Sequence, residues 1–205
     1  MLGYYNYTVV ATYVSLVVSV LGIFQAWEGR SLLSIICLMI SGLLDAFDGK
    51  IARTKLDRTE EEKCFGIQLD SLCDIVCFGV LPAAICRSFG LQSGWALAVC
   101  CLYILCAQIR LAYFNVQEEE RQSRTGGRRM FYSGLPVTSI ALLLPPVYLL
   151  HDHGAEIMHW VAGILLLIVG VLFISPIKVP KPHKAGIAAV IAVGLVELVL
   201  LLLTR

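Results

Sequence analysis

Seven apolar stretches, separated by short polar segments, divide the 205-residue chain. A helix needs roughly 20 apolar residues to cross a bilayer, and each stretch approaches that length. The stretches cover residues 8–24, 31–47, 66–88, 93–116, 134–150, 157–175 and 185–204. Because the polar segments between them are short, the pattern predicts an all-α, polytopic membrane bundle of about seven transmembrane helices. We expect residues 1–205 to form a single membrane-embedded domain.

The composition supports lipid as the solvent of this bundle. Apolar residues make up 58% of the chain and charged residues only 15%, whereas a soluble domain carries about 25% charged residues. The formal net charge is +1, so the chain lacks the basic excess that is typical of nucleic-acid-binding proteins. The composition therefore excludes a disordered chain, disfavours nucleic acid as a partner and makes bilayer lipids the expected surroundings.

Positive charges gather in alternate polar segments. Twelve of the sixteen lysines and arginines follow the second, fourth and sixth stretches: Lys50, Arg53, Lys55, Arg58, Lys63, Arg121, Arg124, Arg128, Arg129, Lys178, Lys181 and Lys184. Cytoplasmic loops carry such an excess of basic residues. The pattern therefore predicts that these segments and the N-terminus face the cytoplasm, and that the last helix leaves the C-terminus outside.

Four aspartates lie at the polar edges of two of the stretches. Asp45 and Asp48 close the second stretch, and Asp70 and Asp74 open the third. Spacings of three and four residues place each pair on one helical face. The first pair alone would also fit helix-end charges paired with neighbouring cations. The second pair is followed at once by apolar residues, and an acid at membrane depth indicates a functional site.

Four carboxylates brought together repel one another unless cations compensate them. Oxygen-only ligands suit Mg²⁺, Mn²⁺ or Ca²⁺, whereas zinc is expected to recruit histidine or cysteine. One ion would leave net negative charge, but two ions roughly 3.5 to 4 Å apart form a clamp for displacement at phosphorus. The acids therefore predict two divalent ions, with Mg²⁺ or Mn²⁺ favoured and Ca²⁺ as a further candidate.

The four aspartates and four residues near them resemble the signature of the membrane-embedded CDP-alcohol phosphotransferases. These eight positions are Asp45-x-x-Asp48-Gly49-x-x-Ala52-Arg53, then Gly66-x-x-x-Asp70-x-x-x-Asp74. Residues 54–65 form a longer connection than is usual for that family, which we interpret as an extended polar turn. Elsewhere, residues 65–83, 110–115, 132–136 and 175–184 are similar to the phosphatidylserine synthase branch. The resemblance thus covers most of the chain.

The resemblance implies a phosphotransferase with a two-metal site made by Asp45, Asp48, Asp70 and Asp74, with Asp74 also acting as general base. It implies CDP-diacylglycerol as donor, with its nucleotide and phosphates against Gly49, Ala52, Arg53 and Gly66. It further implies L-serine as acceptor, phosphatidylserine and CMP as products, a homodimer, and an integral protein of a prokaryotic plasma membrane with its site facing the cytoplasm.

Other basic and polar residues are weaker candidates for contacts with the acceptor or with phosphate. Arg110 lies in an apolar stretch, and its side chain either reaches lipid phosphate or points into the cleft that we expect to hold the substrates. Asn115 falls on the same terminal turns. Arg128 and Arg129 precede the fifth stretch, where they either touch anionic lipid or capture a substrate headgroup.

Two alternative functions also fit these sequence features. The same chemistry could use other substrates, namely CDP-archaeol as donor, as in an archaetidylserine synthase, or inositol phosphate or glycerol phosphate as acceptor. A protein of another class, a cation transporter, could use the intramembrane acids as an ion path. Such transporters usually have broken helices or an inverted repeat, and the sequence indicates neither.

Overall fold

We describe the protein from a computed structural model. The description covers residues 3–52, 54–55, 57–91, 93–124, 131–150, 154–180 and 184–203. Within it the α-helices are α1 (Val10–Trp27), α2 (Ser31–Ala52), α3 (Glu60–Asp74), α4 (Leu81–Ser88), α5 (Gly94–Arg124), α6 (Ile140–Leu143), α7 (Pro145–Tyr148), α8 (Ala155–Ile174) and α9 (Lys184–Leu203). Short 3₁₀ turns, Tyr7–Val9 and Val137–Ser139, precede α1 and α6.

The predicted all-α membrane bundle is confirmed. Within the described ranges, five helical segments are long and apolar enough to cross a membrane: Tyr7–Trp27, Ser31–Ala52, Glu60–Ser88, Gly94–Glu120 and Glu156–Ile174. Shorter apolar helices, Val137–Tyr148 and Ala189–Leu203, lie at the positions of the fifth and seventh predicted stretches. The protein is therefore an integral membrane protein whose helical segments follow the sequence pattern.

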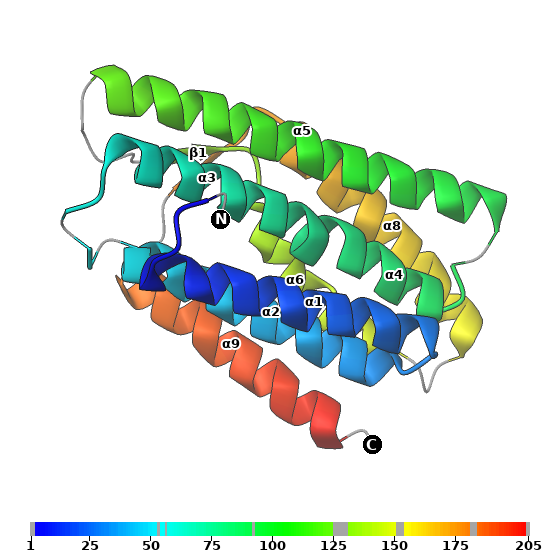
Figure 1. The fold of residues 1–205 in the computed structure, drawn as a ribbon. Coiled ribbons are helices and arrows are strands. Elements are labelled where there is room, and N and C mark those ends of the chain that lie inside the picture. Colours follow the sequence, from blue (N-terminus) through cyan, green and yellow to red (C-terminus); the bar gives the residue numbers. More distant parts are fainter. Residues whose placement is uncertain are drawn as a thin grey trace.

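A single long helical rod runs through the middle of the bundle. It consists of α3, a π-helical segment η2 (Ile75–Val80) and α4. Figure 1 shows α3 and α4 between α1 and α5, and η2 contacts both of these neighbours. Phe78 and Leu81 of this rod are fully buried, so the rod forms the centre of the apolar core. It thereby fixes the orientation of the acids that α3 carries.

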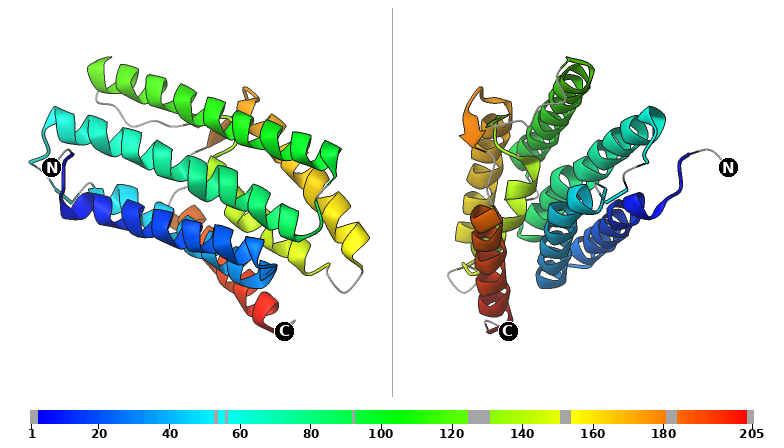
Figure 2. Two further views of the ribbon diagram at one scale, coloured as in Figure 1. Left: turned by 45° about the vertical axis from the view of Figure 1, so that its right-hand side comes forward. Right: turned by 90° about the vertical axis from the view of Figure 1, so that its left-hand side faces the viewer.

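The other helices surround this rod. α1 packs along α2, and α5 packs along α8. The side view in Figure 2 places α8 and α9 on the side of the molecule opposite α1 and α3. α9 is peripheral and touches α2 and α7. The C-terminal ends of α2 and α5 and the N-terminal end of α3 lie at the same end of the bundle, so the basic segments gather there (Figure 1).

The start of α3 corrects one expectation. We expected residues 54–65 to form a polar turn, but α3 already begins at Glu60. The hydroxyl of Thr59 accepts a hydrogen bond from the backbone N–H of Glu62, and the Glu62 carboxylate accepts one from the backbone N–H of Thr59. This capping box, together with three glutamates in the first turn, stabilises a helix N-terminus. Half of the expected turn is therefore helix.

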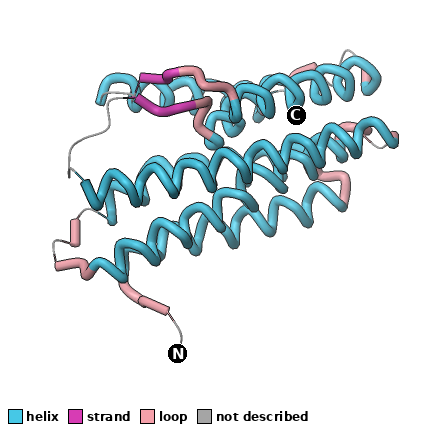
Figure 3. Tube along the Cα trace, turned by 90° about the horizontal axis from the view of Figure 1, so that it is seen from above, coloured by secondary structure: helices cyan, strands magenta, loops and turns pink. Residues whose placement is uncertain are grey.

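Two short strands join distant parts of the chain. β1 (Phe131–Ser133) pairs antiparallel with β2 (Lys178–Pro180), so that Tyr132 lies opposite Val179 (Figure 3). Gly134 follows β1 with a φ of 78°, and its N–H donates to the carbonyl oxygen of Ile177 at 2.8 Å. A Cβ at Gly134 would clash with the carbonyl oxygen of Phe173. This close approach requires glycine and holds the fifth segment against the end of α8.

Candidate metal and nucleotide site

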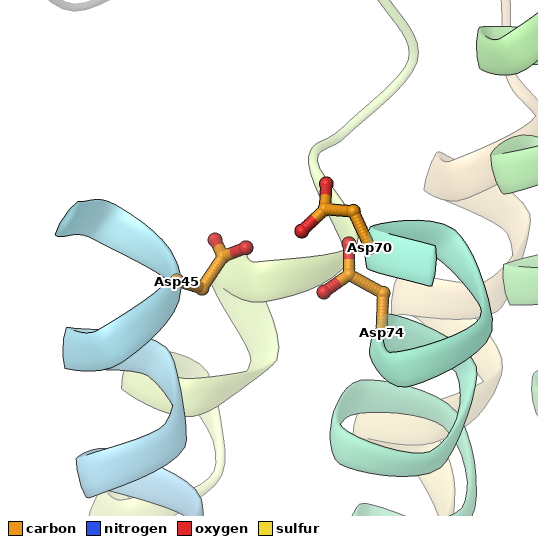
Figure 4. A group of neighbouring side chains, drawn as sticks. All are labelled: Asp45, Asp70 and Asp74. Carbon is orange, nitrogen blue, oxygen red and sulfur yellow. The ribbon is translucent and has the colours of Figure 1, made fainter. Parts of the chain in front are cut away.

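Three of the four predicted acids converge between α2 and α3. Figure 4 shows Asp45 on α2 facing Asp70 and Asp74, which project from successive turns of α3. One carboxylate oxygen from each residue lies within 4.8 Å of those from the other two. All three side chains are half-buried. The C-terminal parts of α2 and α3 therefore converge, as the sequence predicts.

Asp48 lies at the edge of this group. Its carboxyl group lies close enough to the Asp70 carboxyl for the two to interact. Two carboxyl groups in contact require a proton or a cation between them, because two bare carboxylates repel. The pairing of Asp48 with Asp70 thus extends the group to four acids that need compensating positive charge.

The donor set suits hard divalent cations. Two oxygens bound to one Mg²⁺ lie at most about 4.2 Å apart, and about 5 Å apart for Ca²⁺, given their usual bond lengths. The observed limit of 4.8 Å therefore needs only a small closure for Mg²⁺ or Mn²⁺. Among the described residues no histidine or cysteine belongs to this group, so zinc is the poorer fit.

The residues expected to bind the donor nucleotide differ in their surroundings. Gly49 is open, since no atom lies within 4 Å of the position of an added Cβ. Ala52 is the last residue of α2 and is half-buried. Gly66 is covered by the side chain of Arg58. Arg53 lies outside the described residues, so its role in donor binding stays a prediction, as do the roles of the other three.

Arg110 lies close to the acids. The positive charge of its guanidinium acts on Asp45, and the group also sits over the ring of Phe114, with 5.2 Å between Cζ and the ring centroid. Of the two expected orientations of Arg110, this position favours the one toward the acids over the one toward lipid phosphate. A contact with acceptor or phosphate remains a prediction. Arg128 and Arg129 lie outside the described residues.

Asn115 is buried between α5 and α3. Its Oδ1 accepts a hydrogen bond of 2.8 Å from the hydroxyl of Ser71, and its Nδ2 donates to Oε1 of Gln68 at 3.3 Å. Ser71 is the neighbour of Asp70, so this contact steadies the turn that carries the acid. No motif in the sequence singles out Ser71 or Gln68. Their spacing of three residues on the face of α3 that meets α5 is the only available signal.

Comparison with known proteins agrees with this geometry. The profile of the CDP-alcohol phosphatidyltransferase family matches residues 6–175. A Saccharomyces cerevisiae protein named CDP-diacylglycerol–serine O-phosphatidyltransferase is 35% identical over 114 residues, which is 54% of this chain and 40% of that protein. A Methanocaldococcus jannaschii protein of the same name is 32% identical over 148 residues, 72% of this chain and 64% of the other.

A third relative carries a different name. The archaetidylserine synthase of Methanothermobacter thermautotrophicus is 32% identical over 167 residues, covering 81% of this chain and 66% of that protein. The chain thus spans between 40% and 66% of the length of these three relatives. Because the family profile covers most of the chain, the protein belongs to the CDP-alcohol phosphatidyltransferase family.

Proposed function

We propose that the protein is a phosphatidylserine synthase, which transfers the phosphatidyl group of CDP-diacylglycerol to the hydroxyl of L-serine and releases CMP. The observation that supports this most directly is the convergence of Asp45, Asp70 and Asp74 within 4.8 Å, inside the range that the family profile matches. The names of the relatives support serine as the acceptor.

Asp45, Asp48, Asp70 and Asp74 would hold two divalent ions, Mg²⁺ or Mn²⁺. When bound, these ions would neutralise the charge of the donor diphosphate and of the departing CMP. The open backbone at Gly49 leaves room for the nucleotide to approach α2. Ala52 and Arg53 would complete the donor contacts, and Gly66 would contribute to them through the side chain that covers it.

In the reaction, the oxygen of the serine hydroxyl forms a bond to the phosphorus that carries diacylglycerol, and the bond from that phosphorus to the CMP oxygen breaks. A serine hydroxyl is too weak an acid to ionise unaided near neutral pH. A carboxylate within hydrogen-bond reach can take its proton as the new bond forms. We assign this role to Asp74, the deepest acid on α3, with one oxygen for the proton and the other for an ion.

The location of the site fits substrates of opposite polarity. Asp45 lies seven residues from the end of α2, roughly 10 Å along a helix, so the acids sit near one membrane interface. A lipid donor can enter from the bilayer and serine from water. The concentration of basic residues at this end supports a site that faces the cytoplasm. We propose a prokaryotic plasma membrane as the location of the protein. We further propose a single domain and a homodimer, the latter supported by resemblance alone.

The donor and acceptor each have an alternative. The resemblance to an archaetidylserine synthase keeps CDP-archaeol as a second donor. Donor tails lie in the bilayer, where packing discriminates poorly between one apolar chain and another. Inositol phosphate and glycerol phosphate remain the alternative acceptors within the same family. Membership of this family removes the support for a cation transporter.

The experiment supplies purified protein in detergent with CDP-diacylglycerol, Mn²⁺ or Mg²⁺ and labelled serine, and measures CMP and labelled lipid. We expect both products in equal amounts, and none after chelation with EDTA. Asp74→Asn should abolish turnover. Asp57→Asn, which removes an exposed acid outside the cluster, is the matched control and should leave turnover unchanged. CMP release with inositol phosphate or glycerol 3-phosphate, but not with serine, would contradict the proposal.

A further inference from the structure

The segment before Gly66 is organised around one carboxylate. Glu62 accepts two hydrogen bonds from the ammonium group of Lys55, at 2.7 and 2.8 Å. The same carboxylate accepts from Nδ2 of Asn6 and from the backbone N–H of Thr59, both at 3.3 Å. These contacts tie the chain before α1 and the connection between α2 and α3 to the first turn of α3. Side-chain hydrogen bonds therefore hold the connection between α2 and α3 in a defined conformation.

This structure places Arg58 over Gly66. Nη2 of Arg58 donates to the carbonyl oxygen of Glu62 at 3.1 Å. A Cβ added to Gly66 would lie 2.6 Å from the same Nη2, so the absence of a side chain at Gly66 admits the guanidinium. Gly66, Asp70 and Asp74 follow one another at intervals of four residues on α3, and the guanidinium therefore lies on the face that carries the acids.

Among the described residues, no carboxylate forms an ion pair with the Arg58 guanidinium. The Nε of Arg58 is buried and has no hydrogen-bond partner within the part of the chain that the structure describes. A buried donor without an acceptor is destabilising. Such a group next to a binding site is explained when a ligand supplies the acceptor. An arginine fork matches the paired oxygens of a phosphate group.

We propose that Arg58 binds the diphosphate of the nucleotide donor beside the N-terminal part of α3. Its guanidinium lies against Gly66, where there is no side chain to exclude it. This inference rests on the proposed function in one respect, namely that the donor is a CDP-alcohol. Arg58 lies in the segment that is longer than usual for the family. The extension thus supplies an additional phosphate contact, and Glu62 is the residue that positions it.

Binding of soluble CDP tests this role without requiring turnover. CDP is titrated by calorimetry, with Mg²⁺ present, into wild-type protein, Arg58→Ala, Arg58→Lys and Lys63→Ala. We expect Arg58→Ala to weaken binding about tenfold or more, and Arg58→Lys to restore it only partly, because lysine keeps the charge and loses the fork. Lys63, whose ammonium pairs with exposed Glu60, is the matched control, and its removal should change affinity less than twofold.

A double-mutant cycle tests the contact with Gly66. An alanine methyl at position 66 would lie 2.6 Å from Nη2, which is too close, so Gly66→Ala should displace the guanidinium and weaken CDP binding by a similar factor. If the two residues act through one contact, the double variant should bind no more weakly than Arg58→Ala alone. Losses that multiply would contradict the contact, and unfolding temperatures within a few degrees of wild type show that the variants are folded.

Steady-state kinetics show whether Arg58 binds the diphosphate of the donor or the carboxylate of the acceptor. Arg58→Ala should raise KM for CDP-diacylglycerol about tenfold and leave KM for serine unchanged. A raised KM for serine with unchanged CDP affinity would assign the guanidinium to the acceptor carboxylate and overturn the inference. Failure of wild-type protein to use serine would refute the proposed acceptor while the CDP titration still decides the role of Arg58.

Discussion

The hydroxyl of Tyr103 on α5 donates a hydrogen bond of 2.6 Å to the carbonyl oxygen of Phe78 in η2. In a regular α-helix this carbonyl would accept from residue 82, but that residue is Pro82 and has no N–H. The chain instead forms a π-helical turn, in which the N–H of Leu81 donates to Val76. Tyr103 thus satisfies a carbonyl that lipid could not, one turn beyond Asp74.

We therefore expect Tyr103→Phe to lower the free energy of unfolding by about 1–3 kcal/mol, because it leaves the Phe78 carbonyl buried without a donor. Thermal unfolding of the purified protein in detergent measures the loss. Tyr113→Phe is the matched control, since Tyr113 lies on the same helix and is exposed. Equal stability of Tyr103→Phe and Tyr113→Phe would show that the hydrogen bond contributes nothing.

Gly42 lets α2 approach α6 closely. A Cβ at this position would lie 2.7 Å from Cβ of Ala141, one turn of α2 before Asp45. Gly42→Ala should therefore push the helices apart and destabilise the protein by about 1–3 kcal/mol. Ala141→Gly removes the opposing methyl, and the double variant should unfold at a higher temperature than Gly42→Ala alone. A double variant less stable than either single variant would refute this packing.

Asn115 offers a choice between a structural role and a contact with acceptor. Its bonds to Ser71 and Gln68 predict that Asn115→Ala lowers stability by about 1 kcal/mol. It should also lower kcat without changing KM for serine, because the turn that carries Asp70 is held less firmly. Steady-state kinetics and thermal unfolding measure the two effects. Unchanged stability with a raised KM for serine would instead place Asn115 on the acceptor.

Much of the fold could be predicted from apolar pattern alone. All seven expected stretches contain helix, because a backbone in lipid must satisfy its own hydrogen bonds. The convergence of Asp45 with Asp70 and Asp74 was also predictable, since a short connection brings adjacent helix ends together. The pairing of β1 with β2 was not, because three-residue strands that lie more than forty residues apart leave no periodic signal.

Other features depend on local chemistry that hydrophobicity does not report. The capping box at Thr59 extends α3 by one and a half turns into a segment of high polarity. Pro82 indicates a disturbed helix but does not determine that a π-helical turn results. Arg58 is one of several basic residues in its segment, and only its position over Gly66 distinguishes it. That position depends on contacts across the chain.

We propose that acids from α2 and α3 jointly hold a pair of divalent ions against the nucleotide diphosphate. Anomalous diffraction at the manganese edge, from crystals grown with Mn²⁺ and CDP, would locate these ions. We expect two peaks, each within about 2.5 Å of carboxylate oxygens from Asp45, Asp48, Asp70 or Asp74, and their loss in Asp70→Asn. Nucleotide density without manganese beside these carboxylates would contradict the proposal.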